Sequence, residues 1–312
     1  MKTAVVLLGL VALQDRVSPD LLDYEPSGTL SGTLQLGPPQ GFENLLTRWA
    51  DRMKEHHPDL RGGKIEGTAL STPKALISGS SRFGILARRW TESELDEYRQ
   101  RWDCHPLELV VGGDALAIVV HPENPIRSLL LDQVDALFSS TRRRGGKAIR
   151  TWGDLGLEGE WNQRPIHPYA GGKETPARRQ FQERALQGGQ FREDLKEVSG
   201  SGAVLLAVAQ DPCGVGFVAG GARSESTRVV PLQPAAGAAA VEPQPESIVS
   251  LSYPLAWRIC IAVRKVPRVP LDPEVVEFLK MILSRDGQGI LAGEGLAPVT
   301  GRFARKELLK LR

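Results

Sequence analysis

The sequence predicts a two-lobed α/β protein, and three observations support this fold class. The chain has 312 residues, enough for two domains of ordinary size, and 41% of them are hydrophobic, enough to build packed cores. Segments of strand pattern alternate with amphipathic helical segments joined by short loops, which is typical of mostly parallel sheets covered by helices. Residues 107–120 form a nearly continuous apolar run, which predicts a buried strand that carries the chain from one lobe into the other.

The predicted crossing strand contains the pair Gly112-Gly113 and is followed by a turn with Pro122 and Pro125. A glycine pair inside a strand pattern indicates a bend or the close approach of another backbone. A second apolar run, at 255–263, is the candidate for the return crossing. Two lobes joined in this way would leave a cleft between them, and clefts bind ligands.

The elements before the crossing strand follow one another in alternation. Helical spacing of Leu45, Leu46, Trp49 and Met53 predicts the longest of these helices. In order, we expect a strand at 32–37, a helix at 41–56, a strand around 62–65, a short helical piece at 74–77, a strand at 83–86 and a helix at 92–102.

A second alternating set follows Pro125. In order, we expect helix 130–138, a turn at 152–156, strand 165–169, helices 175–186 and 202–210, strand 215–219, the return strand and a helix at 273–283 before a tail rich in Lys and Arg. Residues 233–248 are low in complexity, with many Ala, Pro and Gln, and predict a flexible surface loop.

Composition and motifs exclude several classes of protein. A net charge of +2, with a basic run at 141–147 that lacks aromatic residues, gives no support for nucleic-acid binding. The chain has no Gly-x-Ser-x-Gly motif and no Walker-type phosphate loop, and its histidines lack the spacing of metal ligands. We therefore expect no catalysis, no metal and no cofactor.

The first residues are typical of a short secretory signal, since Lys2 precedes an apolar run at 4–13. We expect residues 1–14 to be a signal peptide and the protein to be periplasmic or otherwise exported; the alternative is a buried first strand. The run is too short to cross a bilayer as a helix. An exported chain with Cys104, Cys213 and Cys260 could form at most one disulfide, and the sequence does not choose the pair.

Three segments carry side chains suited to an anion. Thr175-Pro176 has the pattern of a helix start, whose free N–H groups and dipole favour an oxyanion, and Arg178 adds a fork of donors. Arg88 follows the strand at 83–86, and Ser71-Thr72 precede Pro73 at another helix start. The alternatives are ordinary capped helices and a solvated arginine.

Taken together, the segments resemble the substrate-binding protein of the ABC-type phosphate uptake system, within the type II periplasmic binding-protein superfamily. The resemblance covers roughly residues 30–300 and depends on the order and spacing of its segments. These segments are 45–50, 75–79, 88–94, 114–117 with Asn124-Pro125, 137–138, 152–156, 181–186, 207–212 with 214–217, 253–255 and 277–279.

The resemblance implies a lobe I of residues 30–117 and 257–312, a lobe II of residues 118–256, and two crossover strands. Each lobe would hold a mixed, mostly parallel sheet flanked by helices. In this family a dehydrated phosphate lies in the interlobe cleft, held by Ser and Thr hydroxyls, helix N-termini and an Arg. The resemblance also implies a monomer, a possible ABC permease as partner, and a role in transport or sensing.

The family's site maps onto this chain with losses. Ser71 and Thr72 keep their hydroxyls, Ala87-Arg88 keeps only the Arg of a Ser-Arg pair, and Thr175 keeps one hydroxyl of a Ser-Gly-Thr loop, with Arg178 following. The segment 38–41 carries no hydroxyl where the family has Ser and Thr. The site is therefore divergent. Each unmet bond to a buried oxyanion costs about 1–3 kcal/mol, so the lost donors would weaken phosphate binding. The alternative function is a degenerate binding fold that acts as an interaction or sensing module without tight anion binding.

Overall fold

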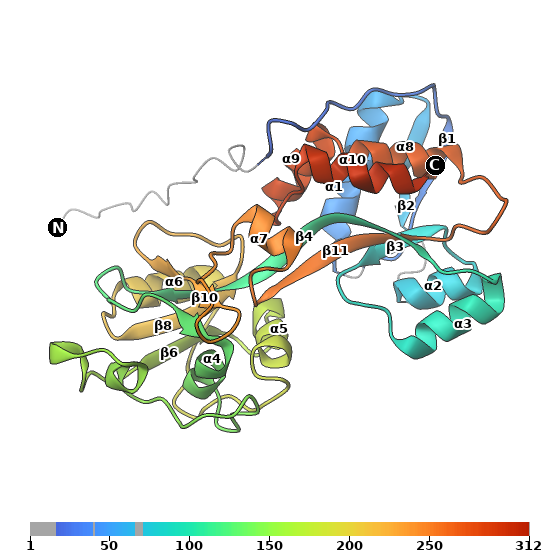
Figure 1. Ribbon diagram of the computed structural model, residues 1–312. Coiled ribbons are helices and arrows are strands. Elements are labelled where there is room, and N and C mark those ends of the chain that lie inside the picture. The colour runs from blue at the N-terminus through green and yellow to red at the C-terminus, as the bar shows by residue number, and fades with distance from the viewer. Residues whose placement is uncertain (1–16, 40, 66–70, 312) are drawn as a thin grey trace. The chain divides into compact units, whose positions relative to one another are not determined.

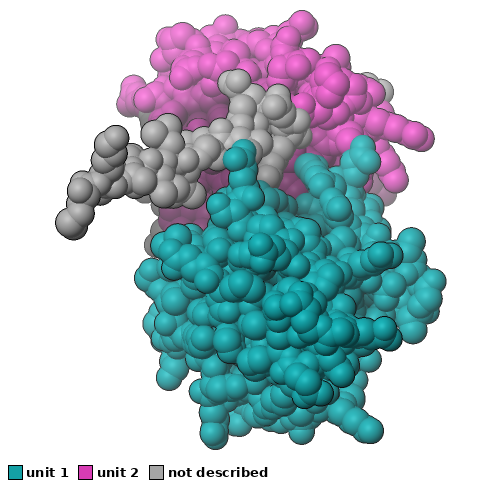
Figure 2. Space-filling model, turned by 90° about the vertical axis from the view of Figure 1, so that its left-hand side faces the viewer, with its two compact units in different colours: residues 1–11, 114–256 teal, residues 12–113, 257–312 magenta. Residues whose placement is uncertain are grey.

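The computed structural model describes residues 17–39, 41–65 and 71–311, and the predicted signal peptide at 1–14 lies outside them. The described chain forms two compact units (Figure 2). Unit 1 contains Asp114–Ala256, and unit 2 contains the residues up to Gly113 and those from Trp257 onward. The chain therefore passes between the units within one long strand and returns at the start of another.

Unit 2 combines strands with helices from both ends of the chain (Figure 1). Its elements are β1 (Gly32–Leu36), α1 (Glu43–His56), β2 (Leu60–Ile65), α2 (Thr72–Ser78), β3 (Phe83–Leu86), α3 (Glu92–Trp102), the first half of β4 (Leu107–Val120), β11 (Ala256–Val263), α8 (Pro273–Ile282), α9 (Arg285–Gly293) and α10 (Gly301–Leu308). Strands β1 and β2 are parallel, whereas β11 lies between β3 and β4 and is antiparallel to β3.

The glycine pair of β4 brings another part of unit 2 against the strand. Gly113 and Ala297 exchange two backbone hydrogen bonds, of 2.9 and 2.8 Å. A Cβ added to Gly112 would lie 2.7 Å from the Leu291 side chain, so a larger residue does not fit without a shift. The close approach predicted from the Gly-Gly pattern is confirmed.

Unit 1 contains the second half of β4 and twelve further elements of the described chain. They are β5 (Leu129–Leu130), α4 (Leu131–Phe138), the 3-10 helices Trp152–Leu155 and Gly159–Trp161, β6 (His167–Gly171), α5 (Pro176–Arg184), β7 (Lys196–Val198), α6 (Ser201–Ala209), β8 (Gly214–Ala219), β9 (Arg228–Val230), β10 (Leu232–Gln233) and α7 (Pro245–Ser250). The sheet is mixed: β8 and β9 run antiparallel to β4, and β6 runs parallel to both β7 and β8.

Aromatic side chains fill the core of unit 1 between its helices and its sheet. Phe181 of α5 stacks on Phe217 of β8 with ring centroids 3.7 Å apart, and Phe138 of α4 meets both edge-on. Tyr253 precedes the return strand, and its buried hydroxyl donates to the carbonyl of Leu116 on β4. The start of the return strand is thereby fixed to the crossing strand.

Two element predictions are incomplete. The predicted loop at 233–248 is partly ordered, since Leu232 pairs with Val241 and α7 begins at Pro245. Proline suits the first helical turn, and Gln244 completes a capping box with Ser247. The predicted basic tail folds instead into α9 and α10.

All three cysteines are free thiols, and no helix of the described chain is long and apolar enough to span a membrane.

Candidate functional site

The predicted anion-binding residues of unit 1 lie where two parallel strands end together. Gly171 of β6 is in register with Val198 of β7, and helices α5 and α6 begin a few residues beyond these strand ends. The carboxyl ends of parallel strands, followed by helix starts, are the usual ligand-binding edge of α/β folds. Thr175 is the residue before α5, and Arg178 lies in its first turn.

Close packing brings the loops around these residues together. A Cβ added to Gly171 would lie 3.1 Å from Oγ1 of Thr175 and 3.4 Å from Cα of Gly200, so glycine allows both loops to approach the strand end. Thr175 Oγ1 donates to the carbonyl of Gly172 at 2.7 Å. The hydroxyl is therefore oriented by its own loop and keeps its lone pairs as acceptors.

Arg178 is held by contacts on several sides. Its Nη1 donates to the carbonyl of Gly171 and to Oε2 of Glu197, both at 3.0 Å, and its guanidinium lies 4.6 Å from the ring centroid of Phe191. The residue is only 9% exposed. The guanidinium is thus fixed in direction, and part of its charge is balanced by Glu197.

The predicted anion-binding residues of unit 2 lie at the start of α2 and just after the end of β3. Thr72 is fully buried and donates its hydroxyl proton to the carbonyl of Ile85 at 2.6 Å. A Cβ on Gly84 would lie 2.8 Å from Thr72 Oγ1 and 3.1 Å from Cδ of Pro38, so Gly84 allows this tight packing. Ser71, the N-cap residue, has extended backbone and makes no side-chain capping bond.

Arg88 follows β3 and is turned toward helix α3. Its Nη1 and Nη2 donate to the two carboxylate oxygens of Glu94, at 2.8 and 2.6 Å. Glu94 is itself fixed, since it accepts from the N–H of Thr91 in the capping box of α3. The Arg88 guanidinium holds the pKa of Glu94 below its usual range, so the pair is ionised at neutral pH.

The structure therefore groups the predicted residues by unit: Thr175 with Arg178 in one, and Ser71 and Thr72 with the strand that precedes Arg88 in the other. Sequence analysis missed the two carboxylates that pair with the arginines. Glu94 has a signal in the sequence, because it stands three residues after Thr91 as in a capping box. Glu197 has none, since only the pairing of β6 with β7 brings it to Arg178.

Arginines of the basic run at 141–147 donate hydrogen bonds to carbonyls at the end of helix α5. Arg143 donates to the carbonyl of Gln187, and Arg144 donates to the carbonyls of Arg184 and Ala185. Cations at the last carbonyls of a helix satisfy acceptors that lack an intrahelical partner. The run is therefore tied to the fold of unit 1.

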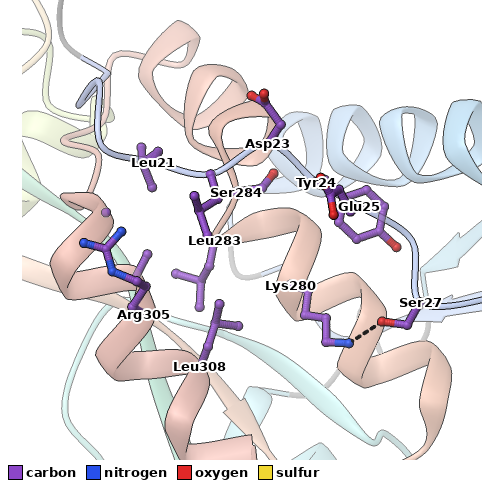
Figure 3. Close-up of a pocket in the computed structure, with 13 residues that line it drawn as sticks. Leu21, Asp23, Tyr24, Glu25, Ser27, Lys280, Leu283, Ser284, Arg305 and Leu308 are labelled. Carbon is purple, nitrogen blue, oxygen red and sulfur yellow. Dashed lines mark hydrogen bonds between the residues drawn. The ribbon is translucent and has the colours of Figure 1, made fainter.

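A cavity of about 450 Å³ lies in unit 2 between the N-terminal segment and helices α8 and α10 (Figure 3). Leu21, Leu283 and Leu308 form its apolar walls, and Lys280 reaches across to Ser27. None of the predicted anion-binding residues lines this cavity. Within the described residues, no cluster of three or more His, Cys, Asp or Glu side chains could hold a metal ion.

Comparison with known proteins identifies the class. The family model described as the PBP superfamily domain matches residues 25–286, and the chain belongs to this superfamily. Its relatives include the phosphate-binding protein PstS of Pseudomonas aeruginosa, 34% identical over 306 residues, which cover 97% of this chain and 94% of the relative. The predicted family is confirmed.

Solved structures show the same fold. A possible phosphate binding protein from Planctomyces limnophilus covers 91% of this chain with a TM-score of 0.68 and 20% identity, and 98% of that chain is covered. PstS from Borrelia burgdorferi covers 86% of this chain with a TM-score of 0.69 and 17% identity, and it is covered completely. The predicted two-lobed type II fold is confirmed.

Proposed function

We propose that the protein is an exported, non-catalytic solute-binding protein that captures phosphate or a related oxyanion for an ABC transporter. One observation carries the proposal: a phosphate-binding protein is 34% identical to this chain over nearly its whole length. The predicted site residues Arg88, Ser71, Thr72, Thr175 and Arg178 would supply the cations and hydroxyls that an oxyanion requires.

The two arginines would provide most of the attraction. Arg88 is fixed by Glu94, so it loses little side-chain freedom when an anion binds. Arg178 is fixed by Glu197 and stands in the first turn of α5, where the positive end of the helix dipole adds to its charge. Both guanidiniums keep further N–H groups, because each has five.

The internal contacts also set an upper limit on affinity. Thr72 and Thr175 already donate their protons to carbonyls of the chain, and the carboxylates of Glu94 and Glu197 face the arginines. To bind, an oxyanion must replace the carbonyls as the acceptor of the two threonine protons. It must also lie close to arginines whose charge is partly balanced by the two carboxylates. We therefore expect weaker binding than in a site that has all its donors free.

Thermal unfolding in the presence of anions tests the proposal. A ligand that binds only the native state at 100 times its Kd stabilises the protein by about 2.7 kcal/mol, which raises the Tm by several degrees. We expect this rise with phosphate or arsenate at millimolar concentration, against chloride at the same ionic strength. An unchanged Tm with phosphate, arsenate and sulfate alike would refute tight oxyanion binding.

A further inference from the structure

The N-terminal strap, defined here as residues 18–30, is fastened to the C-terminal helices of unit 2. Its first anchor is Asp20, whose carboxylate oxygens accept from the N–H groups of Gly301 and Arg302 at 2.8 and 3.0 Å. A Cβ on Gly301 would lie only 2.0 Å from the carbonyl oxygen of Asp20, so this contact requires glycine. The strap thus caps the start of α10.

The second anchor is Arg285 at the start of α9. Its backbone N–H donates to the carbonyl of Leu22 at 2.8 Å, and its guanidinium contacts the carbonyl of Leu21 and the carboxylate of Asp23, at 2.8 and 2.9 Å. Further along, Lys280 Nζ donates to Ser27 Oγ at 2.7 Å (Figure 3). These anchors are polar and partly exposed.

The third anchor is buried and contains a histidine. Tyr24, His57 and Glu277 are 6%, 1% and 5% exposed. The Tyr24 hydroxyl donates to Oε2 of Glu277 at 2.9 Å and lies 2.7 Å from Nε2 of His57. On the other side of the imidazole, the backbone N–H of Leu30 points at Nδ1 at 3.3 Å. One ring therefore contacts both ends of the segment 24–30.

The donors around His57 decide its tautomer. Because Nδ1 accepts from the Leu30 N–H, the proton of the neutral ring is on Nε2 and is donated to the Tyr24 oxygen. The chain of hydrogen bonds then runs from Leu30 through His57 and Tyr24 to the Glu277 carboxylate. Every member is satisfied only while His57 is neutral.

The charged groups around His57 form ion pairs with other residues. Helix α8 contributes Glu277 and Lys280, which pair with each other at 2.7 Å. On α1, the neighbouring His56 is paired with Asp286 of α9 at 3.0 Å. Burial lowers the pKa of His57; the charge of Glu277 opposes this and that of His56 adds to it. The neutral ring is therefore the form that the folded unit favours.

We propose that His57 is a pH-sensitive latch whose protonation releases the strap segment 24–30 from the rest of unit 2. Protonation places a hydrogen on Nδ1, directly opposite the Leu30 N–H, so that two donors face each other and both are left without an acceptor in a partly buried site. Release would uncover the Tyr24 side of the cavity beside Lys280 and Glu277.

The anchor carboxylates of Asp20 and Glu277 do not titrate in the same range. The Ser18 hydroxyl and the Gly301 N–H hold the pKa of Asp20 below its usual range. Burial raises the pKa of Glu277, but hydrogen bonds from Lys280, Tyr24 and Ser27 hold it below its usual range. Both carboxylates stay ionised at pH 5, so a change between pH 7.5 and 5 reports on histidine.

Hydrogen exchange of the Ser27 and Leu30 amides, corrected for the intrinsic rate at each pH, tests the latch. A released histidine has a pKa near 6.5, so protection falls by up to about 30-fold between pH 7.5 and 5 if the docked ring stays neutral. His57→Gln keeps one donor and one acceptor but does not titrate, and its protection should be independent of pH. His105→Gln, at an exposed position of the same unit, should respond like the unaltered protein.

Equal protection at both pH values in the unaltered protein would overturn the proposal, as would an unaltered pH response in His57→Gln. If that variant does not fold, an NMR titration of the histidine rings in the unaltered protein decides instead. The midpoint of the His57 ring titration must then lie below 6.5, and the Leu30 amide signal must change with the same midpoint. A His57 ring that titrates without any change at Leu30 contradicts the latch.

Discussion

Gln288 joins three parts of unit 2 through one buried amide. Its Nε2 donates to the carbonyls of Val111 on β4 and Ile282 at the end of α8, at 3.0 and 2.9 Å. Its Oε1 accepts from the N–H of Val299 at 2.8 Å, and the residue is fully buried. The side chain therefore fixes the crossing strand to the helices that follow it in the fold.

Replacing Gln288 by Leu preserves most of the volume but removes all three bonds. Each buried partner left unmet costs about 1–3 kcal/mol, and at the lower end of that range the three together cost about 3 kcal/mol. Because Leu fills the space, no cavity contributes further. We therefore expect Gln288→Leu to lower the free energy of unfolding by about 3 kcal/mol.

Urea unfolding followed by tryptophan fluorescence measures the loss, since Trp49 is buried in unit 2 and bonds to the carbonyl of Gly287. The midpoint should fall while the m-value stays constant. Gln100→Leu, at an exposed position on α3, is the matched control and should change stability by less than about 0.5 kcal/mol. A loss below about 1 kcal/mol for Gln288→Leu would refute the role assigned to this amide.

Three further predictions concern single substitutions, two of them with a matched control variant. Gly112→Ala should destabilise unit 2 by about 1–3 kcal/mol, because the added methyl group overpacks the site. Gly289→Ala, whose added methyl group meets open space on α9, should stabilise unit 2 by about 0.5–1 kcal/mol. Urea midpoints that move in the same direction for both variants would contradict this prediction. Arg88→Ala should weaken phosphate binding about tenfold to hundredfold by calorimetry, and Arg89→Ala, also exposed, should not; equal losses would argue against Arg88. Tyr253→Phe should cost about 1 kcal/mol in thermal unfolding, since it loses one buried hydrogen bond to β4, and no loss would show that this bond contributes nothing.

Sequence pattern predicts the fold well where burial is one-sided or continuous. The apolar run at 107–120 becomes β4 over the same residues, and the helical spacing around Trp49 becomes α1. Elements that depend on local capping are harder to predict. Helix α7 follows an Ala- and Pro-rich stretch, and its start depends on Gln244 and Pro245 rather than on an apolar face.

The candidate site is less predictable than the fold, because its contacts join residues distant in sequence. Side-chain types identify Arg88 and Thr175, but not the direction in which each points. Arg178 turns toward Glu197 only because β6 and β7 are parallel neighbours. No sequence motif marks Gly84, yet the lack of a side chain at this glycine makes room for Thr72. Such close approaches become visible only once the chain has folded.

Calorimetric titration of the protein with phosphate tests the central claim most directly. We expect saturable binding of one phosphate per chain, with an affinity that falls when Arg88 is replaced by Ala. Titrations with arsenate and sulfate under the same conditions define the range of anions accepted. Absence of saturable binding with all three anions, in a protein that unfolds cooperatively, would contradict the proposed function.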